Sequence, residues 1–372
     1  MLSPLDETLL HQTPEPFGHV YTSDHRFFDR NWFGCFARDG SIGVITGMGA
    51  YANMNVIDGF ASVQAAGRQH NLRASRPLRN DLEGVRVGPI RHEVVEPLRT
   101  HRLLLDAGDH GTAFELTWTG TFPAHIEPRH YDRLDGRVYQ DYRRFDQMGR
   151  VEGWIEVDGA RVEVFDGIGI RDHSWGVRRS TGGFEPFTGS MPPEIHGSLF
   201  IWVEFATPDA NGHLQLTENA RGERSMLEGF IATRDGDDLS RVEVVDVRHD
   251  IEFHPECRTY RRVVLDIDTS DGETHRLEAA PILTAWAYRG TGYDSGFDDG
   301  KGLGAYRGEV AEHDVYDVSH PEEVVLPTTE VIRPMHREQS VRLTFDGAEG
   351  FGHLPVMPIG SNERYGFEGL GS

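Results

Sequence analysis

The sequence is poor in cysteine, in positive charge and in long apolar runs, and each shortage excludes a class of protein. Two cysteines among 372 residues, Cys35 and Cys257, cannot supply a disulfide framework or a cysteine-ligated zinc site. No stretch is apolar and long enough for a membrane span. The N-terminus carries Asp6 and Glu7 where a signal peptide needs basic residues and then an apolar run, so we expect a cytoplasmic protein.

The charge balance is strongly acidic. Lysine and arginine together number 37 against 60 aspartates and glutamates, which gives a formal net charge of −23. Such a chain repels the phosphates of nucleic acids and of anionic lipids, and we expect neither as a partner. The length is comfortable for two domains. The sequence makes no prediction of oligomeric state.

The hydrophobic pattern favours β structure throughout. No amphipathic helix of standard length is visible, whereas short alternating strands are separated by the turn pairs Asp39-Gly40, Asp158-Gly159 and Asn211-Gly212. The stretch 179–194 is rich in Gly, Pro, Ser and Thr, which is typical of a linker. We therefore predict an all-β protein with two tandem antiparallel β-barrel or sandwich domains, residues 1–185 and 186–372.

The densest chemistry lies at Gly169-Ile-Arg-Asp-His-Ser-Trp-Gly176. On a strand, alternate side chains point to opposite faces, with Ile168, Ile170, Asp172 and Ser174 on one face and Arg171, His173 and Trp175 on the other. Because the isoleucines belong in a core, Asp172 would enter an apolar space, where a carboxylate is either paired or raised in pKa. A raised pKa would let Asp172 act as an acid near neutral pH.

A structural interpretation of the same residues stays open. Asp172 and Arg171 could form an ion pair at the domain junction, with His173 bonded to the backbone. Trp175 could pack as a core indole instead of lining a pocket.

The stretch 169–176 resembles a signature of the superfamily that includes the carotenoid 1,2-hydratases (hydroxyneurosporene synthases) and lipocalin-like enzymes that catalyse cycloadditions. Residues 300–314 resemble the second-domain signature of a less characterised bacterial branch of this group. The resemblance implies two lipocalin-like barrels, a deep apolar pocket at or near their junction, bulky apolar substrates and no organic cofactor. It also implies that Asp172 is the match for the acid that protonates an alkene in the hydratases.

Other residues are candidates for the pocket wall. His25 and Trp32 lie on or before an early strand, while Tyr51 and Asp58 follow the Gly-rich turn at 47–49 and mix polar with apolar groups, as a pocket wall does. With Trp175, these residues form the predicted substrate-binding set. Asp172, His173 and Arg171 form the predicted catalytic set.

The sequence supports a metal site or a nucleotide site less well than it supports proton transfer by Asp172. His130 and Asp132 with a distant His173 have the outline of a two-histidine, one-carboxylate iron site, but such tripeptides arise easily in a chain with 19 histidines. No phosphate-binding glycine loop and no serine nucleophile elbow occurs. We predict no metal and no cofactor.

The leading prediction is a cofactor-independent lyase or isomerase, hydratase-like, acting on a hydrophobic isoprenoid, polyene or aromatic compound. Asp172 or His173 would transfer the proton, and Arg171 would tune its pKa or bind a substrate oxygen. Two alternatives are a non-catalytic lipocalin-like carrier of a hydrophobic ligand and a carbohydrate-active β-sandwich enzyme.

Overall fold

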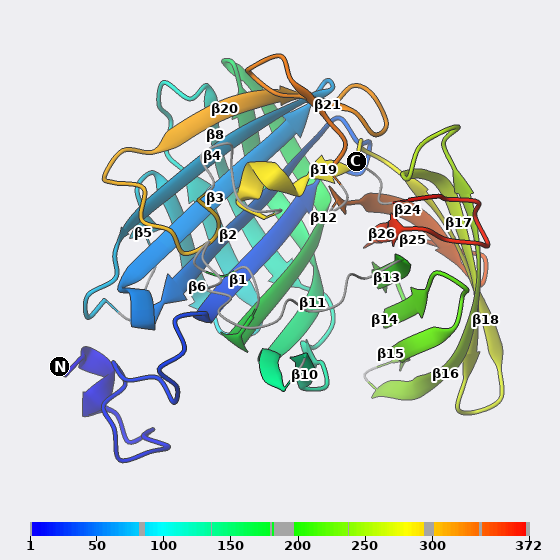
Figure 1. The fold of residues 1–372 in the computed structure, drawn as a ribbon, viewed down its shortest axis with the longest axis horizontal. Helices are drawn as coiled ribbons and strands as arrows, with labels where there is room; N and C mark the ends of the chain where they lie inside the picture. The colour runs from blue at the N-terminus through cyan, green and yellow to red at the C-terminus, as the bar shows by residue number, and fades with distance from the viewer. Residues whose placement is uncertain are drawn as a thin grey trace.

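Two large antiparallel sheets stand side by side in the computed structural model (Figure 1). The structure describes residues 2–81, 86–134, 136–178, 181, 197–236, 238–293, 301–334 and 337–369. Strands dominate, and the helices in these ranges are short 3-10 turns at Pro4–Glu7, Ala52–Met54 and Tyr288–Thr291. The predicted all-β class is confirmed.

The first sheet has 15 strands. Its path runs β5-β6-β7-β8-β11-β12-β1-β2-β3-β4-β20-β21-β22, with β9 and β10 paired to β11. The bounds are β1 Phe27–Phe36, β2 Ile42–Tyr51, β3 Val56–Ala65, β4 Arg68–Pro77, β5 Arg86–Val87, β6 Ile90–Glu96, β7 Thr100–Leu105, β8 Thr112–Gly120, β9 His125–Ile126, β10 His130–Leu134, β11 Arg137–Val157, β12 Ala160–Val177, β20 Glu312–Asp317, β21 Val324–Val325 and β22 Val331–Ile332. The sheet curls, so that β5 contacts β3 and β4.

The second sheet closes into a barrel of eight strands. Its bounds are β13 Gly197–Ala206, β14 Ala210–Asn219, β15 Arg224–Asp235, β16 Asp238–Phe253, β17 Tyr260–Thr269, β18 Thr274–Pro281, β24 Ser340–Phe345 and β25 Ala348–His353, with β26 Val356–Gly360 added to β13. Closure follows because β13 pairs with both β14 and β25. A separate pair joins β19 Trp286–Ala287 to β23 Arg337–Glu338.

Each sheet fills its own interior with apolar side chains. Phe33, Leu103 and Trp118 belong to the cluster inside the first sheet, and Leu199 and Val263 to the cluster inside the barrel. Strand alternation sends neighbouring side chains out of the first sheet, toward the barrel. We call this outward surface, which carries Trp32, Asp146, Ile168 and Asp172, the junction face.

Part of the C-terminal half of the chain joins the first sheet instead of the barrel. Strand β20 pairs with β4 in the register Asp314↔Asn71, and β21 and β22 extend the same sheet. Residues 301–314, which are most of the second signature, therefore lie against or within the first sheet. The predicted domain boundary at 185/186 lies outside the described residues.

Ser319, Glu322 and Glu323 together predict one helical turn from the sequence. The structure shows that this prediction is wrong. Residues 319–323 are bends and coil, because the Ser319 backbone N–H and hydroxyl both donate to Asp317 Oδ1 and Pro321 disfavours a helical residue before it.

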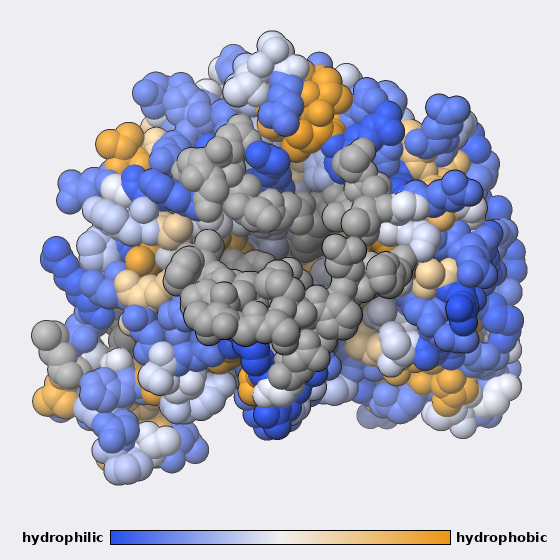
Figure 2. All heavy atoms as spheres, viewed as in Figure 1, coloured by the Kyte–Doolittle hydropathy of each residue, from blue (hydrophilic) through white to orange (hydrophobic). Residues whose placement is uncertain are grey.

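The visible surface outside the grey atoms of Figure 2 is largely hydrophilic. In Figure 2 hydrophilic residues cover both sheets, and apolar residues appear only in small separate groups. Among the described residues, no helix has the length and apolar character needed to cross a membrane.

Candidate active site at the junction face

Asp172 sits in the middle of β12, between two strands of the first sheet. Its direct neighbours across the ladder are Trp32 on β1 and Asp146 on β11. Directly paired residues project to the same side of a sheet, so these three side chains form one row on the junction face. The next row on this face holds Arg30, Ser174 and Arg144.

Asp172 is half-buried as a residue, and its carboxyl group is surrounded by protein. Burial raises its pKa to about 6, although the nearby cations Arg144 and Arg178 oppose the rise. Burial penalises the charged form of an acid, and positive neighbours favour it. Asp172 can therefore exchange a proton near neutral pH.

Aromatic rings and guanidinium groups border the same space. The Arg178 guanidinium lies 5.9 Å from the Tyr142 ring centroid and 5.3 Å from that of Tyr293. Tyr293 stacks on Tyr288 at 4.4 Å. Tyr142, Tyr293, Arg144 and Arg178 are all partly accessible, so a ligand near Asp172 would meet flat apolar faces together with positive charge.

The remaining residues of the predicted catalytic set lie on the opposite face of β12. Arg171 is buried inside the first sheet, where its Nε and Nη2 donate to Gln147 Oε1 at 3.0 and 2.8 Å. Burial lowers its pKa to about 10. His173 Nε2 is hydrogen-bonded to Asp29 Oδ1 at 2.7 Å. The structure therefore brings neither Arg171 nor His173 into the row of Asp172, and the alternative of a direct Asp172–Arg171 ion pair is wrong as well.

The predicted substrate-binding set is also divided. Trp175 lies beside the His173 ring at 5.7 Å, away from Asp172. His25 lies near Asp24 with its Nδ1 3.9 Å from Oδ1, and its side chain is 40% exposed. Trp32 shares the junction face with Asp172 but is only 2% exposed and packs 5.3 Å from the His353 ring.

Tyr51 and Asp58 form a buried cluster around Arg30. Arg30 Nη1 donates to Tyr51 Oη at 3.0 Å and lies 3.8 Å from Asp58 Oδ1. Asp58 Oδ2 accepts the backbone N–H of Gly304 at 2.7 Å, which ties the second signature to this cluster. The Arg30 charge also acts on Asp172. These two residues therefore support the row of Asp172 from one side.

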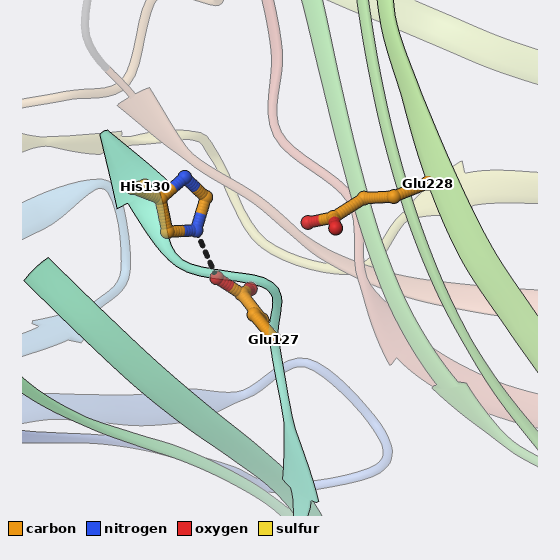
Figure 3. A group of neighbouring side chains, drawn as sticks. All are labelled: Glu127, His130 and Glu228. Carbon is orange, nitrogen blue, oxygen red and sulfur yellow. Dashed lines mark hydrogen bonds and ion pairs between the residues drawn. The ribbon is translucent and has the colours of Figure 1, made fainter. Parts of the chain in front are cut away.

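Sequence reasoning missed a polar cluster on the other side. Glu127 Oε1 accepts from Arg144 Nη2 at 2.6 Å and also from Gln215 Nε2 on the barrel, and Glu127 Oε2 bonds to His130 Nε2 at 2.6 Å. Figure 3 shows Glu228 of β15 pointing toward Glu127 from across the junction. Glu127 opens a stretch that reads only as polar in the sequence, and no local pattern links it to the barrel.

The iron site outlined by the sequence is not formed. Asp132 accepts from Gln140, while His130 bonds Glu127. In the part of the chain that the structure describes, the potential metal-ligating groups are Glu127 with His130 and Glu228, and Glu127 with Asp146 and His213.

Three cavities lie elsewhere on the described residues, and none of them includes the row of Asp172. One of about 530 Å³ lies between the two sheets, lined by Met148 and Ile168 of the junction face and by Ala206 and Phe351 of the barrel. Two others, of about 540 and 400 Å³, lie at the base of the barrel around Arg258 and beside Ile282. Asp172 lines none of the three.

Comparison with known proteins places this arrangement in a family. A family model described as a family of unknown function, DUF8625, matches residues 2–368. The chain belongs to this family. No curated protein matches its sequence.

Several solved structures are similar to this DUF8625 protein. A Nitrosomonas europaea protein provisionally called AttH superposes with a TM-score of 0.52 at 16% identity, over 96% of this chain and 99% of that one. Kievitone hydratase from Nectria haematococca gives 0.47 at 10% identity, over 90% and 89% of the two chains. CghA with Sch210972 gives 0.41 at 11%, over 89% and 88%. The first likeness shows that the two chains share a fold and carries no information about the reaction.

Proposed function

We propose that this DUF8625 protein is a hydratase-like enzyme that adds water to, or removes it from, a conjugated double bond, with Asp172 as the proton-transfer group. The observation that carries the proposal is the placement of Asp172, a half-buried residue whose carboxyl group has its pKa raised to about 6, on a face bordered by arginines and tyrosines. A general acid–base works best when its pKa lies near the working pH. The resemblance of residues 169–176 to the hydratase signature adds support.

The neighbouring cations favour one type of substrate. Protonation of an isolated alkene leaves a carbocation, which Arg144 and Arg178 would repel. Water addition to a conjugated carbonyl or quinone-like compound instead places negative charge on the substrate oxygen, which guanidinium groups stabilise. We therefore favour an aromatic or polyketide-like compound with a conjugated oxygen over a plain isoprenoid.

Asp172 would serve both proton transfers. In the ionised form it takes a proton from water as the oxygen attacks the β-carbon, and the resulting enolate rests against the arginines. The protonated Asp172 then delivers that proton to the α-carbon, so that hydrogen and hydroxyl are added and the carboxylate is regenerated. Elimination of water follows the same steps in reverse. Tyr142 and Tyr293 would hold the flat substrate.

The alternative functions fit the molecule less well. A lipocalin-like carrier would hold its ligand inside a barrel, but apolar clusters occupy both interiors among the described residues. A carbohydrate-active sandwich would present tryptophans in an open groove, whereas Trp32, Trp118, Trp202 and Trp286 are buried.

The test is conversion of a panel of conjugated phenols and enones by the full chain, followed by mass spectrometry in heavy-oxygen water and in deuterium oxide. We expect a product heavier by one water, with solvent deuterium on carbon, and a loss of at least about 100-fold in rate for Asp172→Asn.

Asp166→Asn is the matched control. It lies on the same strand, its side chain is 51% exposed, and asparagine tolerates its positive φ of 50°. Conversion at the wild-type rate by folded Asp172→Asn would refute the assignment.

A further inference from the structure

A second group of titratable side chains lies between the two sheets, beside the row of Asp172. The first sheet contributes Asp146 and Arg144 from β11 and Glu127 from the segment between β9 and β10. The barrel contributes three residues, Glu204 on β13, His213 on β14 and Glu228 on β15. Four carboxyl groups thus face one guanidinium, that of Arg144, and two imidazoles, those of His213 and His130, so that acidic groups outnumber basic ones in a buried space.

Asp146 is the clearest sign that something is missing from this cluster. The residue is 1% exposed, and neither of its carboxyl oxygens has a hydrogen-bond donor among the described residues, although the Glu127 carboxyl group lies close enough to share a proton with it. The nearest cationic atoms are Arg144 Nε at 3.6 Å from Oδ1 and His213 Nδ1 at 4.0 Å from Oδ2. A buried carboxylate without donors costs several kcal/mol unless a proton or a cation compensates it.

His213 points an unused nitrogen into the same space. The residue is 2% exposed, and its Nε2 has no hydrogen-bond partner within the described part of the chain. Nε2 lies 3.7 Å from Glu127 Oε1 and 3.9 Å from Glu228 Oε1. Its other nitrogen, Nδ1, is hydrogen-bonded to Glu204. A carboxylate that holds one nitrogen of a histidine while the second nitrogen faces a cluster of oxygens is the usual support of a metal-ligating histidine.

We propose that Glu127, Asp146 and His213 bind one divalent transition-metal ion, with Glu228 as an additional ligand. The ligand atoms of the first three already lie within 4.8 Å of one another, so modest side-chain movements bring them to bonding distance of about 2.0–2.2 Å. One imidazole with several carboxylates suits Zn²⁺ or Mn²⁺. The inference does not depend on the proposed hydratase reaction.

Glu127 can take part without losing its existing bonds. An ionised carboxylate offers about four lone pairs, and Arg144, Gln215 and His130 use three of them. The arrangement of Figure 3, in which Glu127 and Glu228 approach from opposite sheets, places a potential cation bridge across the domain junction.

The test uses the full chain, treated with chelator and titrated with Zn²⁺ by calorimetry, and with Co²⁺ by visible absorption. We expect one ion per chain, a ligand-field spectrum with Co²⁺ and a higher melting temperature with either metal. Asp146→Asn and His213→Gln should weaken Zn²⁺ binding by more than about tenfold.

The matched control is His249→Gln. His249 is also buried in the barrel and paired with a carboxylate, Glu218, at 3.0 Å, but it lies outside the cluster. It should bind Zn²⁺ as the wild type does. Glu204→Gln tests positioning, because it removes no proposed ligand and should still lower the affinity by roughly 10–100-fold.

A shared proton is the competing explanation, and the same variants separate it. If a proton bridges Asp146 and Glu127, Zn²⁺ neither binds in the calorimeter nor raises the melting temperature of the wild type. That result, or undiminished binding by folded Asp146→Asn, overturns the proposal.

Discussion

Asp172 on β12 lies directly opposite Asp146 on β11, so two carboxyl groups occupy adjacent positions on one face. Like charges opposed in this way destabilise a sheet, and burial raises the pKa of both. The two carboxyl groups have different surroundings. Asp172 stays half-buried and near arginines, which suits proton exchange, while Asp146 is enclosed with His213, which suits a cation.

The first prediction concerns pH and Asp172. Its pKa is about 6 in the folded protein against 3.8 in the unfolded chain, so the folded state loses stability as the pH rises through this interval. Asp172→Asn removes the loss. Denaturant unfolding should find the variant more stable than wild type by about 3 kcal/mol near pH 7, and by little near pH 4. An equal difference at both pH values would contradict this account.

The second prediction concerns His213 in chelator-treated protein. Burial lowers its pKa, but the ion pair with Glu204 outweighs burial and raises the pKa to about 9, against 6.5 in the unfolded chain. The contribution to stability is complete below pH 6.5 and is lost as the pH rises through 9. Wild type should lose on the order of 3 kcal/mol over this interval relative to His213→Gln. Parallel stability curves for the two proteins would show that His213 does not titrate there.

The third prediction concerns the second signature. Gly304 has a φ of +75°, and a Cβ there would lie 2.8 Å from Tyr51 Cδ1. Gly308 has a φ of +95°, and no heavy atom of the described residues beyond its chain neighbours lies within 4 Å of a Cβ built there. Gly308→Ala should cost about 1–2 kcal/mol from backbone strain alone. Gly304→Ala should cost clearly more in the same denaturation experiment, and equal costs would mean that Tyr51 moves aside freely.

The fourth prediction separates two tryptophans of the predicted substrate-binding set. Trp32 is 2% exposed, so Trp32→Ala should lower the free energy of unfolding by about 3–5 kcal/mol. Trp175 is partly exposed, and Trp175→Ala should cost much less. Circular dichroism monitored during denaturation gives both values, and a small cost at Trp32 would point to a side chain available to ligands.

Local sequence patterns predict individual strands and the turns between them. Alternation alone sets Asp172 and Arg171 on opposite faces of β12, and the Asp158-Gly159 turn between β11 and β12 is where the pattern predicts it. Alternation cannot say what covers each face. Arg171 and His173 entered the predicted catalytic set because they are adjacent to Asp172 in sequence, and strand geometry separates adjacent side chains.

The sequence by itself determined the β class, the tight turn between β11 and β12 and the placement of Asp172 and Arg171 on opposite faces of one strand, because these depend on residues a few positions apart. Only the tertiary structure decided that Glu127 meets Gln215, 88 positions away, and that β20 returns to β4. The first contact arises because the two sheets pack their outer faces together, and the second because a late strand pairs with an early one in the same sheet. Both join residues far apart in the chain, so no pattern within one strand predicts them.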